Sequence, residues 1–316
     1  MTEPSPEQPA DVPLSTWLLT DGRPGHAAQL RGLAQALSRR QAMDLRWVDV
    51  RQQPLSWLDA LSGKYPGLAT QLPPTLALAA GHGTHRHLLA LGRACGCFTC
   101  VLMRPSLPLC CFDAAIIPAH DRPRQSPRVL VTQGVLNPIQ PGTRANDMTG
   151  LILLGGPSSH FGFVLSDLCG QISALCRHFP EIEWTASSSR RTPAGTLQAL
   201  QALGLTNLRV IDHSETPPGW VADMLERCAQ AWITEDSVSM VYEALSAGLA
   251  TGLIAMPALG RGRVQRGLDE LCSGGMVSRL DAILAGGALR PPPQALQEAE
   301  RAAEWLLNAL AMETAA

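Results

Sequence analysis

Residues 16–26 read TWLLTDGRPGH, an apolar run closed by a Gly/Pro turn that ends in histidine. Apolar residues at helical spacing follow through Leu37, so the order is strand, turn, helix. A second copy of this arrangement begins at Leu151, where an apolar run leads into Gly155-Gly156-Pro157-Ser158-Ser159-His160. We therefore expect both halves of the chain to start with a parallel β-strand followed by a helix.

Short apolar runs continue to alternate with helical periodicity in each half. They predict strands over 16–20, 45–50, 75–80, 98–103, 112–117, 129–131, 151–154, 182–186, 208–211, 231–234 and 249–256. The pattern is typical of an α/β protein with two doubly wound, Rossmann-like domains that face a cleft.

The domain limits follow from the composition between the runs. A linker rich in Gly, Pro and Asn separates an N-terminal domain, 14–147, from a C-terminal domain, 148–316. We expect a disordered tail over 1–13. The terminal helix, 294–311, is free to pack back on the N-terminal domain.

Composition restricts the function classes. Of 316 residues, 46% are hydrophobic and 16% charged, and the formal net charge is −2, so we expect a buried core and no nucleic-acid partner. Nine cysteines without a signal-peptide pattern indicate free thiols in a reducing cytoplasm.

No run approaches the roughly 18 apolar residues of a membrane span. A peripheral contact with the inner membrane is compatible with the sequence, and Leu55, Trp57 and Leu58 are candidates for touching a lipid carrier.

The stretch Asp236–Glu243 joins a predicted strand to a helix. Ser237 suits the N-cap, and the free N–H groups of that helix start, with Ser239 and Met240 beside it, form a candidate diphosphate site. Glu243 shares a helix face with Ser239, so its carboxylate can accept both hydroxyls of a ribose. An ordinary capped helix with a solvated glutamate is the plainer interpretation, and both are open at this point.

Two arginines, Arg190 and Arg191, stand just before a predicted helix start at Thr192-Pro193. Positive charge is unfavourable at that end of a helix unless an anion compensates it, and arginine suits bidentate phosphate contacts. The alternative is a pair of solvated arginines on a loop. We expect Gly155, Gly156, Ser158 and Ser159 to shape the floor of the same cleft.

The first turn carries the candidate general base, His26, with Asp21 placed to orient it or to hold the turn. A histidine that only caps or packs is the alternative. Gly22 and Gly25, with Gly81 and Gly83 from the third turn, are expected to give an acceptor access to the backbone. We predict no metal site at His82, His85 and His87, because no carboxylate stands near them at helix spacing.

Four segments together resemble the mitochondrial-fission family, which is widespread in bacteria. They are DGRPGHAAQLRGLAQAL from Asp21, LLGGPSSHFGF from Leu153, SSRRTP from Ser188 and EDSVSMVYEALSAG from Glu235. The resemblance runs from about Trp17 to Leu271 and is most specific over Asp236–Glu243.

The family in turn is similar to GT-B glycosyltransferases, including the enzyme that adds N-acetylglucosamine to lipid-linked peptidoglycan precursors. That enzyme has a glycine-rich turn ending in a histidine, which His26 matches, and a ribose-binding Glu followed five residues later by Gly, as Glu243 and Gly248 are here. The usual Pro two residues further on is Ala250 in this chain. The resemblance implies a nucleotide-sugar co-substrate, with UDP expected, and no other cofactor.

These observations lead to the hypothesis of a metal-independent GT-B glycosyltransferase with an unidentified acceptor. One alternative is a non-catalytic scaffold of the mitochondrial-fission family. Another is a nucleotide-sugar epimerase, for which Asp113, Asp121 and Asp212 are available as acid/base groups.

Overall fold

The computed structural model describes residues 12–142, 148–260 and 262–314, which form two compact units. The first unit combines the chain up to Pro138 with the part from Glu298 onward, and the second runs over Ile139–Gln297. The division therefore lies before the expected one at residue 147. Gly142 illustrates the reason, since its N–H donates to the carbonyl of Ala247 in the second unit. Most of the expected tail 1–13 lies outside the described residues.

The first unit contains a six-stranded, fully parallel sheet in the order β2-β1-β3-β4-β5-β6. Its strands are β1 (Leu14–Thr20), β2 (Met43–Asp49), β3 (Leu76–Ala80), β4 (Phe98–Leu102), β5 (Ala114–Pro118) and β6 (Val129–Thr132). All residues of β3, β4 and β5 are buried, as expected for strands that helices cover on both faces.

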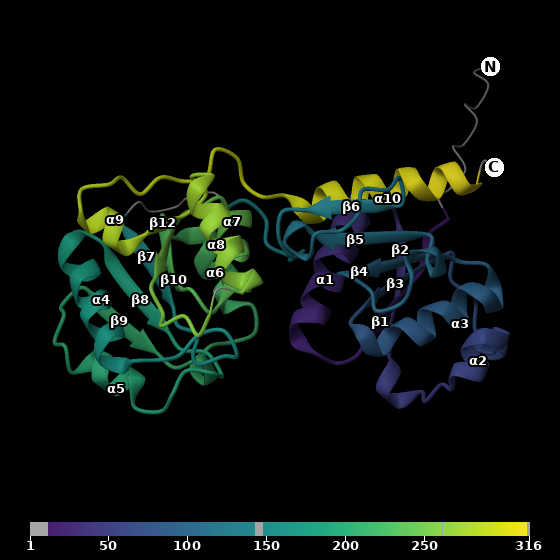
Figure 1. Cartoon of the computed structure of the whole chain (residues 1–316), viewed down its shortest axis with the longest axis horizontal. Helices are drawn as coiled ribbons and strands as arrows, with labels where there is room; N and C mark the ends of the chain where they lie inside the picture. The colour runs from purple at the N-terminus through teal and green to yellow at the C-terminus, as the bar shows by residue number, and fades with distance from the viewer. Residues whose placement is uncertain (1–11, 143–147, 261, 315–316) are drawn as a thin grey trace, which may run out of the picture. The chain divides into compact units, whose positions relative to one another are not determined.

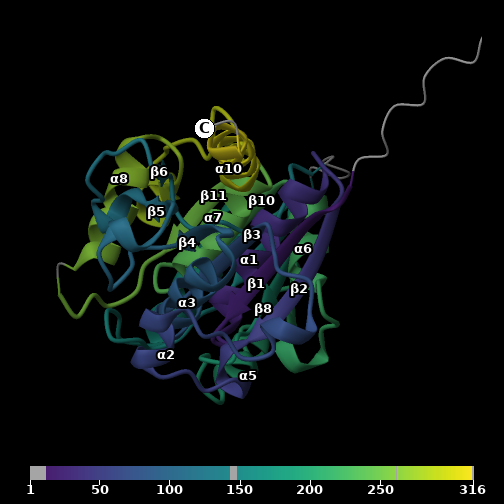
Figure 2. The ribbon, with the colours of Figure 1, turned by 90° about the vertical axis from the view of Figure 1, so that its right-hand side faces the viewer.

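Alternation along the strands divides the first unit's core into two layers. Leu18 packs with the helices α1 (Pro24–Ser38) and α10 (Glu298–Thr314), whereas Trp17 and Leu19 pack on the other face. That second face is covered by α2 (Trp57–Ser62) and α3 (His85–Cys95), which lie side by side in Figures 1 and 2.

Helix α10 belongs to the first unit although it follows the second unit in sequence. Its buried stripe of Ala299, Ala302, Ala303 and Leu306 joins the α1 side of the core. Figure 1 shows this helix, in yellow, beside β5 and β6. The helix begins at Glu298 and ends at Thr314, somewhat later than the predicted 294–311.

The second unit has another six-stranded parallel sheet, in the order β12-β11-β10-β7-β8-β9. Its strands are β7 (Thr149–Leu153), β8 (Glu183–Ser187), β9 (Leu208–Ile211), β10 (Gln230–Thr234), β11 (Ala250–Ile254) and β12 (Ser278–Arg279). Its helices are α4 (Leu165–His178), α5 (Thr196–Gln201), α6 (Trp220–Arg227), α7 (Val238–Ser246), α8 (Arg263–Ser273) and α9 (Leu280–Leu284). The helices α4, α5 and α9 pack on one face through Ile172, Leu200 and Ile283, and α6 and α7 contact β7 and β10.

These two parallel sheets with their helices confirm the predicted α/β fold class. In each sheet the strand order reverses once, between β1 and β3 in the first unit and between β7 and β10 in the second. Ligands of doubly wound sheets bind outside the carboxyl ends of the strands at such a reversal. The loops after β1, β3, β7 and β10 are therefore where a functional site is expected.

Candidate functional site

At the reversal in the second unit, the Gly155-Gly156 pair lets three loops approach one another. The Gly155 N–H donates to Thr234 Oγ1 at 2.7 Å, which ties the end of β7 to the end of β10. A Cβ on Gly155 would overlap the side chains of Asp236 and Ser237, and one on Gly156 would overlap the backbone carbonyl of Arg191. Only glycine fits at these two positions, because the neighbouring groups occupy the space of a side chain.

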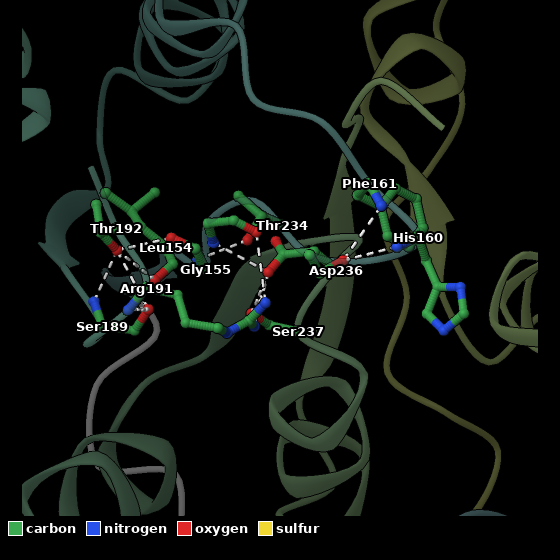
Figure 3. Close-up of polar contacts among 12 residues, drawn as sticks. Leu154, Gly155, His160, Phe161, Ser189, Arg191, Thr192, Thr234, Asp236 and Ser237 are labelled. Carbon is green, nitrogen blue, oxygen red and sulfur yellow. Dashed lines mark hydrogen bonds and ion pairs between the residues drawn. The ribbon is translucent and has the colours of Figure 1, made fainter. Parts of the chain in front are cut away.

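Arg191 reaches across this junction to the start of α7. Its Nη2 lies 2.7 Å from Asp236 Oδ2 and 3.1 Å from Ser237 Oγ, and Figure 3 shows the guanidinium directed at both. The Asp236 side chain is fully buried, and its Oδ2 also accepts from the Gly156 N–H at 3.0 Å. Asp236 Oδ1 has no hydrogen-bond partner among the described residues. The pair fixes an arginine, partly open to solvent, beside the N-terminus of a nine-residue helix.

Ser237 stands at the predicted N-cap position, but the expected side-chain cap is not formed. Its hydroxyl instead donates to Asp236 Oδ2 at 3.2 Å and accepts from Arg191. The competing ion pair draws the hydroxyl away from the helix N–H groups, which leaves those groups without a side-chain cap.

The loop that carries Arg191 is held in place by Thr192. The Thr192 hydroxyl lies 2.7 Å from the carbonyl of Gly155 and 3.0 Å from that of Leu154, and it accepts from the Ser189 N–H at 2.8 Å (Figure 3). Since β7 and β8 are neighbours in the sheet, these bonds fasten the loop after β8 to the end of β7.

A pocket of about 470 Å³ opens at this edge of the second unit. The residues around it come from the loops after β8 and β9 and from the starts of α6 and α7: Ser187, Ser188, Ser189, Arg190, Arg191, His213, Thr216, Val221, Ser237, Ser239 and Met240. The structure therefore brings together five of the predicted donor-site residues, which are Arg190, Arg191, Ser237, Ser239 and Met240. Their chemistry, two guanidinium groups with hydroxyls beside a helix N-terminus, suits a diphosphate.

Glu243 lies one helical turn beyond Ser239 and does not line the pocket itself. Its carboxylate is half-buried and makes no hydrogen bond or ion pair within the part of the chain that the structure describes. Burial raises the pKa of Glu243 to about 7. A carboxylate that is desolvated without a protein partner is available to accept hydrogen bonds from a ligand.

The predicted floor residues Ser158 and Ser159 lie elsewhere. Ser158 Oγ accepts the N–H groups of His160 and Phe161 at 3.2 and 3.1 Å, so it closes a local turn. Ser159 is exposed and neither serine lines the pocket, while the His160 ring points away from the Asp236 cluster in Figure 3. The Ser158 hydroxyl thus stabilises the turn, because a serine near a tight turn bonds most easily to the nearby backbone.

At the reversal in the first unit, His26 Nδ1 lies 2.8 Å from Asp21 Oδ1. Asp21 is the first residue after β1, and His26 lies in the first turn of α1. An ionised carboxylate only accepts, so the bond places the proton on Nδ1 and leaves the Nε2 lone pair free to take another proton. The pair has the geometry of an oriented general base.

The glycines in the loops after β1 and β3 differ in how much space surrounds them. A Cβ on Gly81 would overlap Asp21 and His26, so the turn after β3 packs directly on the pair. Gly22 likewise makes room for the Arg51 guanidinium. Gly83 has only ordinary contact with Asp21, and the space around Gly25 is open. Close approach therefore explains Gly81, and a φ of +77° explains Gly22, because the exposed Arg51 side chain could move aside. Neither reason applies to Gly25.

Of the three histidines after β3, two are part of the packing. His85 Nδ1 lies 3.0 Å from Ser106 Oγ, and burial, with the nearby His82, lowers the pKa of His85 to about 4. His87 Nε2 lies 2.7 Å from the carbonyl of Gln53. No group of three or more His, Cys, Asp and Glu among residues 12–142, 148–260 and 262–314 is arranged to hold a metal ion.

The two carboxylates of the first unit that were considered for an epimerase lie at opposite ends of β5, and the third belongs to the second unit. Asp113 precedes β5, at the amino ends of the strands, and accepts from the N–H and hydroxyl of Thr99. Asp212 accepts from the Ser214 N–H and hydroxyl, and these bonds lower the pKa of Asp212. Asp121 lies in a short 3-10 turn after β5.

Sequence reasoning did not assign Asp236 or His213 to the site, and it took Thr192 for a helix start, whereas α5 begins only at Thr196. The motif containing Asp236 was noted, but an aspartate next to a serine N-cap looks like part of the cap. Only the approach of Arg191 across the Gly155-Gly156 gap shows the role of Asp236.

No helix in the described part of the chain is both long and apolar enough to span a bilayer.

Solved structures share this fold over nearly the whole chain. The UDP-GlcNAc 2-epimerase from Neisseria meningitidis, solved with UDP-GlcNAc bound, has 10% identity and a TM-score of 0.61, covering 95% of this chain and 100% of its own. The glycotransferase of kitacinnamycin has 13% identity and a TM-score of 0.52, covering 95% and 100%. The glycosyltransferase SnogD from Streptomyces nogalater has 14% identity and a TM-score of 0.50, covering 95% of each chain. Identities this low show a common fold, of the GT-B type.

The sequence matches no curated protein. It does match the family model described as Mitochondrial fission ELM1, over residues 24–310. That span includes His26, both arginines and the whole Asp236–Glu243 stretch, and it confirms the resemblance drawn from the motifs. The chain belongs to the mitochondrial fission ELM1 family.

Proposed function

We propose that this protein is a glycosyltransferase that binds a UDP-linked sugar in its second unit and transfers the sugar to an acceptor hydroxyl. The observation that carries the proposal is the position of Arg191, fixed by Asp236 at the uncapped N-terminus of α7 on the rim of the pocket. The UDP-GlcNAc in the Neisseria epimerase structure supports the choice of nucleotide, because that protein shares the fold.

In this proposal the diphosphate lies at the start of α7, between the helix N–H groups and the arginines. Arg190 and Arg191 neutralise the charge that develops on the leaving UDP, which is the task of a divalent cation in other transferases. Glu243 accepts the ribose hydroxyls from the next turn of the same helix. The donor site needs no metal and no cofactor.

The acceptor hydroxyl is deprotonated by His26 Nε2 as its oxygen attacks the anomeric carbon. Asp21 keeps the imidazole in the tautomer that this step requires and stabilises the imidazolium that forms. The bond between the sugar and the UDP oxygen breaks as the new glycosidic bond forms. A general base of this kind contributes about 10²–10⁴-fold to the rate.

Calorimetry with UDP and UDP-sugars tests the donor site. Arg191→Gln should weaken binding about 10–100-fold, because it removes a charge-assisted contact of about 1.5–3 kcal/mol. Arg177→Gln, on the exposed end of α4, is the matched control and should bind as the wild type does. Absence of binding to any of these ligands would remove the donor-site assignment and favour a scaffold.

Product analysis by NMR then separates the reaction classes. Wild-type protein incubated with a UDP-sugar and acceptor candidates should release UDP together with a glycosylated product. An isomerised UDP-sugar without UDP release would assign the protein as an epimerase instead.

A further inference from the structure

Helix α2 exposes three large apolar side chains on the first unit. Trp57 is 48% exposed, Leu58 80% and Leu61 54%, whereas Ala60 is the one residue of this helix that is buried. Positions i, i+1 and i+4 fall within an arc of about 100° around a helix, the width of an apolar stripe, so the three side chains form one apolar surface. A surface helix of a water-soluble domain normally presents polar residues there, and such a surface indicates a binding function.

Cations surround this surface. The Arg86 guanidinium lies 5.6 Å from the Trp57 ring centroid, and Arg93 Nη1 contacts the carbonyl of Leu61 at 2.5 Å. Lys64 follows Gly63, the C-cap of this helix, and is exposed. The acidic residue of α2, Asp59, is held in a capping box with Ser56. Hydrogen bonds from Ser56, together with the charge of the nearby Lys64, lower the pKa of Asp59, so this carboxylate offsets part of the Lys64 charge.

The charge of the surrounding chain has the same sign. Residues 12–138 contain thirteen Lys and Arg but six Asp and Glu. Helix α10 packs on the α1 face of the sheet and α2 on the opposite face, although Glu313, near the end of α10, lines a pocket together with Arg93.

We propose that the surface formed by Trp57, Leu58, Leu61 and the flanking Lys64, Arg86 and Arg93 docks on an anionic lipid bilayer. Trp and Leu side chains enter the boundary between headgroups and acyl chains, to a depth of about 5–10 Å. The three cations remain at the level of the lipid phosphates, where each adds to the attraction. Docking does not depend on the proposed transferase activity.

Flotation of the full chain with vesicles tests this surface. The protein should float with phosphatidylcholine vesicles that contain phosphatidylglycerol and more weakly with phosphatidylcholine alone, and raised salt should lower only the binding to the anionic vesicles. The double variant Leu58→Glu, Leu61→Glu should lower the partition coefficient about tenfold or more, since two carboxylates enter the apolar layer. Leu259→Glu, at a leucine that is 66% exposed in the second unit, is the matched control and should float as the wild type does.

A second pair of measurements separates docking from misfolding. Lys64→Gln should lower partitioning about fivefold on anionic vesicles and leave it unchanged on neutral ones. Quenching of tryptophan fluorescence by brominated lipids should decrease in Trp57→Phe. Failure of the wild type to float, equal loss in Leu259→Glu, or binding to a protein partner with no vesicle binding would overturn the proposal.

Discussion

The guanidinium of Arg191 lies 2.7 Å from the buried carboxylate of Asp236, which joins the loop after β8 to the start of α7. The two residues are far apart in sequence, and the strands that precede them, β8 and β10, do not pair with each other in the sheet. The ion pair therefore fixes the position of the Arg191 guanidinium beside the pocket. Thr192 holds the backbone of the loop, whereas the buried carboxylate of Asp236 directs the Arg191 guanidinium, and this second contribution is open to a direct mutational test.

Asp236→Asn should lower the free energy of unfolding by about 1.5–3 kcal/mol, because an amide replaces the charged partner of Arg191 in a buried site. Urea denaturation measures the change. Asp223→Asn on the exposed side of α6 is the control and should stay within about 0.5 kcal/mol of the wild type. The UDP affinity of Asp236→Asn should fall about tenfold as Arg191 loses its support, whereas a rise would show that Asp236 competes with the diphosphate.

Gly156→Ala should destabilise the protein by about 2–3 kcal/mol, because the new methyl group overlaps the backbone carbonyl of Arg191. Gly170→Ala is the matched control within the same unit. Gly170 lies in helix α4 with open space around it, so alanine there should raise stability by about 0.5–1 kcal/mol. Thermal and urea unfolding of both variants give the comparison, and equal effects would contradict the packing described for the Gly155-Gly156 pair.

Much of the fold follows from local patterns in the chain. Short apolar runs bounded by Gly and Pro correctly located the strands, because strands buried on both faces need continuous apolar sequence. The shortest strand, β12, was missed, since Ser278 and Arg279 are polar and pair only with Gly252 and Leu253 at the sheet edge. The packing partner of helix α10 also could not be predicted from local sequence. Its stripe from Ala299 to Leu306 predicts an amphipathic helix but not which sheet it covers.

The candidate site also contains residues that the sequence could assign and residues that it could not. Arg191 and Ser237 could be brought together from sequence because both follow parallel strands, whose carboxyl ends share one edge. Asp236 could not be assigned, since its burial results from contacts with Gly156 and Arg191, which are distant in sequence. Ser158, which the sequence places on the cleft floor, is not among the residues that line the pocket. Its bonds are entirely local, to the N–H groups of His160 and Phe161, and they compete with any role toward a ligand.

Glu243 makes stability depend on pH. Its pKa is about 7 in the folded chain, against 4.5 for an unperturbed glutamate, so the folded state binds the proton more tightly than the unfolded state. The free energy of unfolding of the wild type, relative to Glu243→Gln, should therefore fall as pH rises from about 4.5 to about 7, and level off outside that range. Urea denaturation at several pH values measures the difference, with Glu226→Gln on α6 as the baseline for removing a carboxylate.

The same residue predicts the pH dependence of ligand binding. A ribose diol donates to the ionised carboxylate, so the UDP affinity of the wild type should increase as pH rises through about 7. Glu243→Gln should lack this increase. Parallel affinity curves for the two proteins would exclude Glu243 from the ribose site.

His26→Gln should reduce kcat of sugar transfer about 10²–10⁴-fold, because it removes the group proposed to take the acceptor proton. Asp21→Asn should also reduce kcat, since an amide facing Nδ1 no longer fixes the tautomer with a free Nε2. UDP binding by calorimetry should be unchanged in both variants, because Asp21 and His26 belong to the first unit and the donor pocket to the second. His178→Gln, on the last turn of α4, is the control and should keep full activity. A variant of His26 that transfers sugar at the wild-type rate would show that the Asp21–His26 pair only stabilises the turn after β1.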